Sequence, residues 1–230
     1  MARIEAILFD KDGTLFDFNA TWAVWAHGLL QDESHGDGDL MAAMAEAIGF
    51  DVQAGRFLSD SVVIGGTVEE VAGALLSFLP NQSLSEVVMR LNAKAASAPQ
   101  VEAAPLVPFL LGLSARGLAL GIATNDAEMP ARAHLQAAGI EHSFDFIAGY
   151  DSGFGGKPDT GQLVGFCEAV GVAPDRCVMV GDSLHDLRAA RAAGFVSVGV
   201  LTGLATRSDL SPLADGVLDS IADLPDWLDR

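Results

Sequence analysis

The stretch Phe9-Asp10-Lys11-Asp12-Gly13-Thr14-Leu15 directly follows an apolar run, residues 3–9, that predicts the first strand of the protein. This run lacks a clean alternation, which is typical of a strand covered on both faces. Asp10 and Asp12 would share one face if the strand continued, but Gly13 indicates that the backbone turns away there. The stretch is therefore either a solvated turn or a pair of catalytic acids at a strand end.

The second half of the chain alternates between strand and helix patterns. Predicted strands cover residues 118–123, 144–148, 177–180 and 196–200, with a weaker one at 216–218; predicted helices lie near 106–113, 130–138, 160–170 and 184–193. This alternation predicts an α/β fold with a doubly wound, mostly parallel sheet and helices on both faces. In such sheets, ligands bind beyond the carboxyl ends of the strands.

Residues 18–98 show helical periodicity throughout. Thr67 with Glu70, and Ser83 with Glu86, have the spacing of capping boxes and predict two helix starts. We therefore expect two domains. Residues 1–17 and 99–230 should form a Rossmann-like core, and residues 18–98 a helical domain inserted after the first strand.

Composition limits the classes of partner. The chain has 230 residues, half of them hydrophobic, and a formal net charge of −18, which argues against nucleic acid or an anionic membrane as partner. A small anionic substrate stays possible, since a bound cation can reverse the field inside one cleft. Residues 1–5 lack the apolar region of a signal peptide, and no apolar stretch is long enough to span a bilayer, so we expect a cytoplasmic protein. Cys167 and Cys177 are too few for a disulfide framework.

Polar residues follow each of the predicted strands that should end at the common crevice. They are Asp10 and Asp12; Thr124, Asn125 and Asp126; Lys157 with Pro158; and the run Gly181-Asp182-Ser183-Leu184-His185-Asp186. Two of these groups also have a purely structural explanation. Asp182-Ser183 could serve simply as a helix cap, and Lys157 could be a solvated loop lysine. A Ser/His catalytic pair at Ser183 and His185 is unsupported, since no G-x-S-x-G elbow is present. The other histidines, His27, His35, His134 and His142, show no ligand spacing, and we expect them at the surface or its boundary.

Taken together, these motifs closely resemble the haloacid dehalogenase-like hydrolase superfamily. The similarity is to its phosphatase branch with a helical cap inserted after the first strand, of which phosphoglycolate phosphatases are typical. The motifs occur in the family's order: the Asp-x-Asp-Gly-Thr-Leu run at residues 10–15, Thr124, Lys157-Pro158, and the Gly-Asp-x-x-x-Asp run at residues 181–186. The resemblance implies Mg²⁺-dependent hydrolysis of a small phosphate monoester, a substrate that is phosphoglycolate-like or a sugar phosphate.

The resemblance also implies a role for each residue. Asp10 would attack phosphorus and become an aspartyl phosphate, while Asp12 would serve as general acid and base. Mg²⁺ would be held by Asp10, the main-chain carbonyl of Asp12, and Asp182. Thr124 and Asn125 would hydrogen-bond phosphoryl oxygens, and Lys157 would steady the nucleophile.

Further implied roles concern residues around this set. Asp186, with Ser183 as N-cap of its helix, would orient Lys157 or a metal-bound water. In the cap, the turn from Ile64 to Thr67 resembles the substrate-specificity loop, which makes Gly65 and Gly66 candidate substrate-binding residues. Phe16, Phe18, Trp22 and Trp25 could face substrate, although the spacing of the two tryptophans favours packing inside the cap.

Some features depart from the family pattern or leave alternatives open. Lys11 occupies a position that is usually apolar in this family, and Phe18 stands where many members carry a small polar residue. A sugar phosphomutase would keep Asp10 and Asp12 but return the phosphoryl group to its substrate. A phospho-accepting signalling module also gathers acids around Mg²⁺, but it needs neither Asp12 nor an inserted domain. We expect a monomer or homodimer acting on a small phosphorylated metabolite.

Overall fold

The computed structural model describes residues 3–58 and 60–230. Met1 and Ala2 of the predicted core and Ser59 of the predicted cap lie outside the described residues. Its main sheet has six strands in the order β5-β4-β1-β6-β7-β8, and every neighbouring pair is parallel. The strands are β1 (Ala6–Phe9), β4 (Ala119–Ala123), β5 (Phe146–Ala148), β6 (Cys177–Gly181), β7 (Val196–Val200) and β8 (Gly216–Leu218). The predicted α/β class with a parallel sheet is confirmed, and the first strand begins three residues later than the apolar run.

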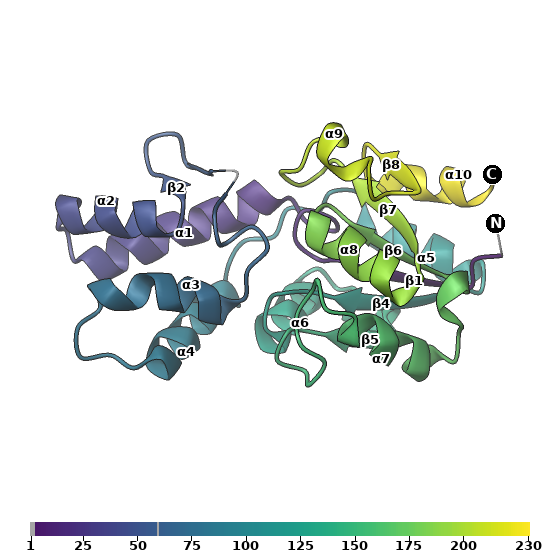
Figure 1. Cartoon of the computed structure of the whole chain (residues 1–230), viewed down its shortest axis with the longest axis horizontal. Coiled ribbons are helices and arrows are strands. Elements are labelled where there is room, and N and C mark those ends of the chain that lie inside the picture. The colour runs from purple at the N-terminus through teal and green to yellow at the C-terminus, as the bar shows by residue number, and fades with distance from the viewer. Residues whose placement is uncertain (1–2, 59) are drawn as a thin grey trace.

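Helices cover both faces of this sheet (Figure 1). They are α5 (Leu106–Ala115), α6 (Glu128–Ala137), α7 (Gly161–Val170), α8 (Leu184–Ala193), α9 (Arg207–Leu210) and α10 (Leu224–Leu228), with short 3₁₀ turns at Glu141–Ser143, Pro174–Arg176 and Ile221–Asp223. Along β1, Ile7 and Phe9 pack with α5 and α6, whereas Ala6 and Leu8 pack with α7 and α8. Alternate side chains thus enter two separate cores, which explains why this strand is apolar at every position.

The cap lies to the left of the core in Figure 1 and is made of α1 (Phe18–Ser34), α2 (Gly38–Ala47), α3 (Val68–Leu75) and α4 (Leu84–Ala95), with a 3₁₀ turn at Leu76–Phe78. These helices bury an apolar cluster of their own, to which Trp22 and Trp25 belong. Both predicted capping boxes are present, at Thr67 with Glu70 and at Ser83 with Glu86. Among the described residues, no helix has the length and apolar character needed to cross a membrane.

One part of the cap prediction is wrong. Residues 50–57 are not helical but form a small antiparallel hairpin of β2 (Phe50–Asp51) and β3 (Arg56–Phe57). Asp51 accepts hydrogen bonds from the backbone N–H groups of Gln53 and Ala54 through its side chain, and its own carbonyl accepts from Gly55. This side-chain turn competes with a helix for the same backbone donors and closes the hairpin.

Two chain segments join the cap to the core and run side by side. The Asp17 N–H donates to the Val101 carbonyl at 2.8 Å, and the Ala103 N–H donates to the Leu15 carbonyl at 2.9 Å. Asp17 also caps α1, because its side chain accepts from the Ala20 N–H. The hinge therefore begins only five residues after Asp12, so the position of the cap depends on the backbone next to the candidate site.

Candidate active site

Asp10 lies at the carboxyl end of β1, and its N–H still donates to the Val180 carbonyl of the neighbouring strand at 2.8 Å. The backbone turns directly afterwards, and Gly13 has a φ of +80°, a conformation that favours glycine. A Cβ atom at Gly13 would lie 2.5 Å from the Asp182 carboxylate. Glycine is thus required both for the turn and for the close approach of the loop to Asp182.

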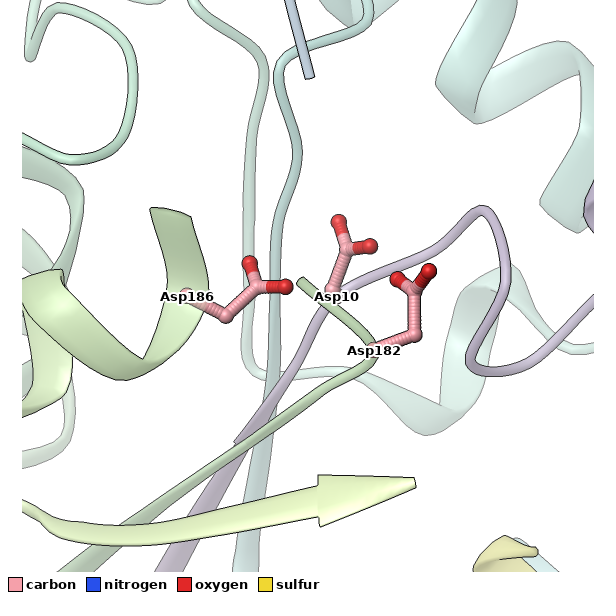
Figure 2. Close-up of side chains that lie close together, drawn as sticks. All are labelled: Asp10, Asp182 and Asp186. Atoms are coloured by element: carbon pink, nitrogen blue, oxygen red, sulfur yellow. The ribbon is translucent and has the colours of Figure 1, made fainter. Parts of the chain in front are cut away.

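Three aspartates from two strand ends lie together at this edge of the sheet (Figure 2). One carboxylate oxygen from each of Asp10, Asp182 and Asp186 lies within 4.8 Å of the others, and all three residues are buried. Asp182 follows β6, the strand paired with β1, and Asp186 lies in the first turn of α8. Parallel pairing therefore brings together acids that are far apart in the sequence.

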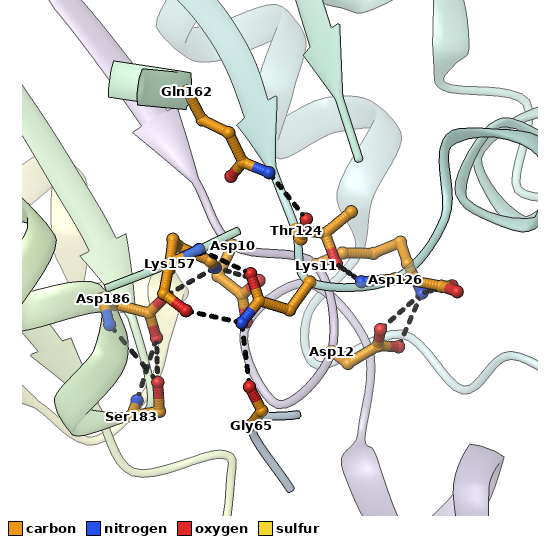
Figure 3. A network of polar contacts seen from close by, with 11 residues as sticks. Asp10, Lys11, Asp12, Gly65, Thr124, Asp126, Lys157, Gln162, Ser183 and Asp186 are labelled. Carbon is orange, nitrogen blue, oxygen red and sulfur yellow. Dashed lines mark hydrogen bonds and ion pairs between the residues drawn. The ribbon is translucent and has the colours of Figure 1, made fainter. Parts of the chain in front are cut away.

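Lys157 supplies a buried cation between two of these acids (Figure 3). Its Nζ lies 2.7 Å from Asp10 Oδ1 and 2.5 Å from Asp186 Oδ1. Burial by itself would lower the pKa of Lys157, but the two carboxylates outweigh it and raise that pKa. The other oxygen of Asp186 accepts from the N–H and the hydroxyl of Ser183. Both oxygens of Asp186 are therefore paired, with Lys157 and with the start of α8. Among the described residues, Asp182 and the second oxygen of Asp10 have no side-chain hydrogen-bond partner.

The surroundings of Asp10 and Asp182 disfavour the charged form of both carboxylates. Burial raises the pKa of Asp10 to about 7, and repulsion from Asp186 and Asp12 adds to the effect that Lys157 opposes. Burial also raises the pKa of Asp182 well above its usual range, with repulsion from Asp10 next in importance. A divalent cation bound by oxygen ligands would remove this penalty, so the chemistry of the donor set fits the Mg²⁺ predicted from the sequence.

Thr124 and Asn125 follow β4, as predicted, but their polar groups differ in availability. Thr124 is buried, and its Oγ accepts from the Asp126 N–H at 3.0 Å, which leaves its own hydroxyl hydrogen free to donate. The Asn125 amide donates to the carbonyls of Gly65 and Lys157, each at 2.8 Å, and accepts from the Lys157 N–H at 2.7 Å. Asn125 therefore fastens the Lys157 loop to the cap, and its predicted contact with phosphate stays a prediction.

The cap loop meets the core at Gly65. A Cβ atom there would lie 2.6 Å from the His185 ring, so a larger residue at this position would displace the ring. With the Asn125 bond to the Gly65 carbonyl, this contact holds the loop over the acids. Gly65 and Gly66 both line the cavity between cap and core. Whether they touch substrate stays a prediction.

A second buried lysine was not assigned a role from the sequence. Lys11 is fully buried, and its Nζ lies 2.7 and 2.6 Å from the two carboxylate oxygens of Asp12 and 3.4 Å from Asp126 (Figure 3). It also lies 5.6 Å from the centre of a Trp22 ring. Burial alone would lower the pKa of Lys11, but Asp12 and Asp126 raise it overall. The lysine at this unusual position thus holds Asp12 in place with a permanent charge.

His134 completes this arrangement, and its predicted surface position is wrong. The side chain is buried, with Nδ1 3.0 Å from Lys11 Nζ and Nε2 2.7 Å from the carbonyl of Ala95 in the cap. Because an ammonium only donates and a carbonyl only accepts, Nδ1 is the acceptor and Nε2 carries the hydrogen. Burial, followed by the nearby charge of Lys11, lowers the pKa of His134 to about 4. His134 therefore links the lysine beside Asp12 to the end of α4.

This neutral histidine predicts a pH dependence of stability. Its pKa falls from an ordinary 6.5 to about 4 on folding, so its contribution is complete above pH 6.5 and is lost as pH falls through 4. The free energy of unfolding, measured with urea, should fall between pH 7 and pH 4 in both proteins. The fall should be larger in the parent than in His134→Gln by up to about 3 kcal/mol. Equal losses in the two proteins would contradict a neutral buried imidazole. Gln keeps a donor and an acceptor but does not titrate, which makes it the matched variant.

A cavity between the cap and the core opens onto these groups. Asp10, Asp12, Thr124, Lys157 and Asp182 line it from the core. From the cap, the lining includes Phe18, Trp22 and Trp25, so the tryptophans belong both to the cap's apolar cluster and to the wall of the cavity. The cavity can therefore hold a ligand with one end at the acids and the other against aromatic side chains.

Comparisons with known proteins agree with this geometry. The family model for haloacid dehalogenase-like hydrolases matches residues 4–194. A phosphoglycolate phosphatase of Colwellia psychrerythraea is 30% identical over 211 residues, which is 90% of this chain and 88% of that protein. A phosphoglycolate phosphatase of Rhodospirillum rubrum is 40% identical over 120 residues, 52% of this chain and 50% of that protein. The chain thus aligns with only about half the length of some curated relatives.

Solved structures share the fold at low identity. A haloacid dehalogenase phosphatase of Thermococcus onnurineus has a TM-score of 0.70 and 23% identity, covering 98% of both chains. A β-phosphoglucomutase of Clostridium difficile has a TM-score of 0.68 and 20% identity, covering 99% of this chain and 100% of that one. These structures show the fold alone. The family match over most of the sequence, on a parallel sheet with acids at its strand ends, shows that the chain belongs to the haloacid dehalogenase-like hydrolases.

Proposed function

We propose that the protein is a Mg²⁺-dependent phosphatase that hydrolyses a small phosphate monoester through an aspartyl phosphate on Asp10. The observation that carries this proposal is the Asp10 carboxylate, buried at a strand end, paired with Lys157 and facing the cavity under the cap. The phosphoglycolate phosphatases among its relatives support the class of reaction. We further propose that it acts in the cytoplasm, as a monomer or homodimer, on a metabolite.

The metal would be held by the side chains of Asp10 and Asp182 and by the main-chain carbonyl of Asp12. When bound, Mg²⁺ supplies positive charge that neutralises phosphoryl oxygens and favours attack by an anionic nucleophile. Lys157 favours the ionised form of Asp10 and fixes the direction of its carboxylate through the 2.7 Å contact. The free hydroxyl hydrogen of Thr124 can donate to a phosphoryl oxygen.

Hydrolysis of the ester then takes two displacement steps at phosphorus. In the first, an Asp10 oxygen bonds to phosphorus, the ester P–O bond breaks, and the leaving alkoxide takes a proton from Asp12. In the second, Asp12 takes a proton from water as the water oxygen bonds to phosphorus, and the bond from Asp10 to phosphorus breaks. Asp12 lines the cavity, and Lys11 holds its carboxylate from the side.

The test is phosphate release from a panel of monoesters with Mg²⁺ and with EDTA. At least one monoester should be hydrolysed, and EDTA should lower the rate at least about tenfold, with recovery when Mg²⁺ is restored. Mg²⁺ should also raise the melting temperature of the parent but not that of Asp182→Asn, a readout that does not depend on turnover. Failure to hydrolyse any monoester by a folded protein would refute the proposal. Recovery of an isomeric phosphate ester instead of free phosphate would indicate a phosphomutase.

A further inference from the structure

The wall of the cavity that faces the acids is apolar. The cap contributes Phe18, Trp22, Trp25, Ile64, Val68 and Val71 to the lining. Phe18, Trp22, Trp25 and Val71 are buried members of the cap's own cluster, so their positions are fixed by packing. The part of a substrate that extends away from the phosphoryl group would therefore lie against rigid aromatic and aliphatic side chains.

Within the described part of the cap, no lysine or arginine lines the cavity. Residues 18–98 contain three basic residues, Arg56, Arg90 and Lys94, and none of them lines the cavity. Arg90 pairs with Glu33 at 2.6 Å, Lys94 pairs with Asp32, and Arg56 is exposed on β3. The basic side chains of the cap are thus placed elsewhere.

The core does not compensate for this lack. Among the described residues that line the cavity, Lys157 is the one lysine or arginine, and its ammonium is already shared by Asp10 and Asp186. The carboxylates of the lining are Asp10, Asp12, Asp126 and Asp182, and its one imidazole is His185, which lies beside the loop at Gly65. A second anion on the substrate would lose its water and face four carboxylates, while the one lysine of the lining is already paired.

The polar atoms on the cap side are neutral. The indole N–H of Trp25 and the amide oxygen of Asn92 are buried, and neither has a hydrogen-bond partner within the part of the chain that the structure describes. Both residues line the cavity. Neither atom carries a charge, so the polar groups of these two residues offer no counterion to an anionic substrate.

We propose that the site, given the phosphatase function proposed above, takes monoesters whose alcohol part is neutral and mainly apolar, and disfavours alcohol parts that carry a second anion. Phosphoglycolate, with a carboxylate one carbon from its ester oxygen, is a disfavoured substrate on this basis. The preference follows from this chain's own cap and separates it from relatives named for that compound.

Matched pairs of esters test the proposal. In the first pair, 2-hydroxyethyl phosphate and phosphoglycolate share a two-carbon skeleton and differ only at the terminal carbon. In the second pair, butyl phosphate is compared with the phosphate ester of 4-hydroxybutanoate. The neutral member of each pair should have a kcat/KM at least about 100-fold higher, since burying an unpaired carboxylate costs several kcal/mol. Equal values, or a preference for the carboxylated member, would overturn the inference.

Matched variants of the cap wall test its cause. Asn92→Lys adds a cation at the cavity, and Asn92→Met adds similar length without charge. Relative to Asn92→Met, the lysine variant should raise the ratio of kcat/KM for phosphoglycolate to kcat/KM for 2-hydroxyethyl phosphate at least about tenfold. Val68→Lys and Val68→Met repeat the comparison on another helix if Asn92→Lys does not fold. No gain in either lysine variant would refute the charge argument.

The two proposals fail in different ways. If the folded protein with Mg²⁺ hydrolyses none of these esters and none of a wider panel, the phosphatase function fails, and the inference that rests on it falls as well. If the carboxylated esters are hydrolysed as well as the neutral ones, the phosphatase function stands and only the substrate class is wrong.

Discussion

Asp10→Asn should lower kcat for phosphate release by at least about 10⁴-fold at saturating substrate. An amide oxygen is a far weaker nucleophile than a carboxylate, so the acyl phosphate that water later hydrolyses would not form. The substitution also removes the anion that lies 2.7 Å from Lys157 Nζ and lines the candidate metal site. Release of inorganic phosphate, measured on the best ester of the panel with Mg²⁺, checks the result.

Loss of the fold must be separated from loss of the nucleophile. Asp10→Asn takes one negative charge out of a cluster of three buried acids, so its melting temperature in EDTA should not fall below that of the parent. Asp10→Glu keeps the charge but moves the carboxylate by one carbon, and it should also be inactive because in-line attack needs a fixed distance. Turnover by Asp10→Asn within tenfold of the parent would show that another group attacks phosphorus.

Much of the core and its acids could be predicted because the information is local. Each strand reads as a short apolar run, and the first polar residue after the run marks the edge of the sheet. Asp10, Thr124 and Asp182 are far apart in the sequence, yet parallel pairing of β1 with β4 and β6 places them along one edge. The family resemblance implies that Asp186 orients Lys157 or a metal-bound water, and the structure has Asp186 Oδ1 at 2.5 Å from Lys157 Nζ.

The remaining features depend on contacts that no local pattern reveals. The hairpin at residues 50–57 is closed by the Asp51 side chain within a segment whose apolar spacing also suits a helix. The position of His134 depends on Lys11, 123 residues earlier, and on a carbonyl of the cap. A histidine on an amphipathic helix gives no sign of this, although a lysine at a usually apolar position beside Asp12 was a signal that a buried partner network exists. The sequence of the cap contains few lysines and arginines, but their distance from the cavity depends on the fold.

Asp12→Asn should lower kcat about 10²- to 10⁴-fold on alkyl phosphates, because their alkoxides need a proton as they leave. The loss in the first step should be much smaller on 4-nitrophenyl phosphate, whose leaving group departs without protonation. Hydrolysis of the intermediate would still lack its general base. We therefore expect a burst of about one nitrophenolate per chain, followed by slow turnover, and a phosphorylated chain in the mass spectrum of acid-quenched enzyme.

Lys11→Met is the matched variant for this prediction, because it keeps the Asp12 carboxylate but removes the ammonium that lies 2.6 to 2.7 Å from both its oxygens. Without that contact the carboxylate loses its fixed position but can still carry a proton, so the loss of kcat should be smaller than in Asp12→Asn and no burst should accumulate. A burst in Lys11→Met would mean that release of the phosphoryl group depends on the lysine itself. Full activity of Asp12→Asn on alkyl phosphates would exclude Asp12 as the acid, since the step that most needs a proton would then proceed without it.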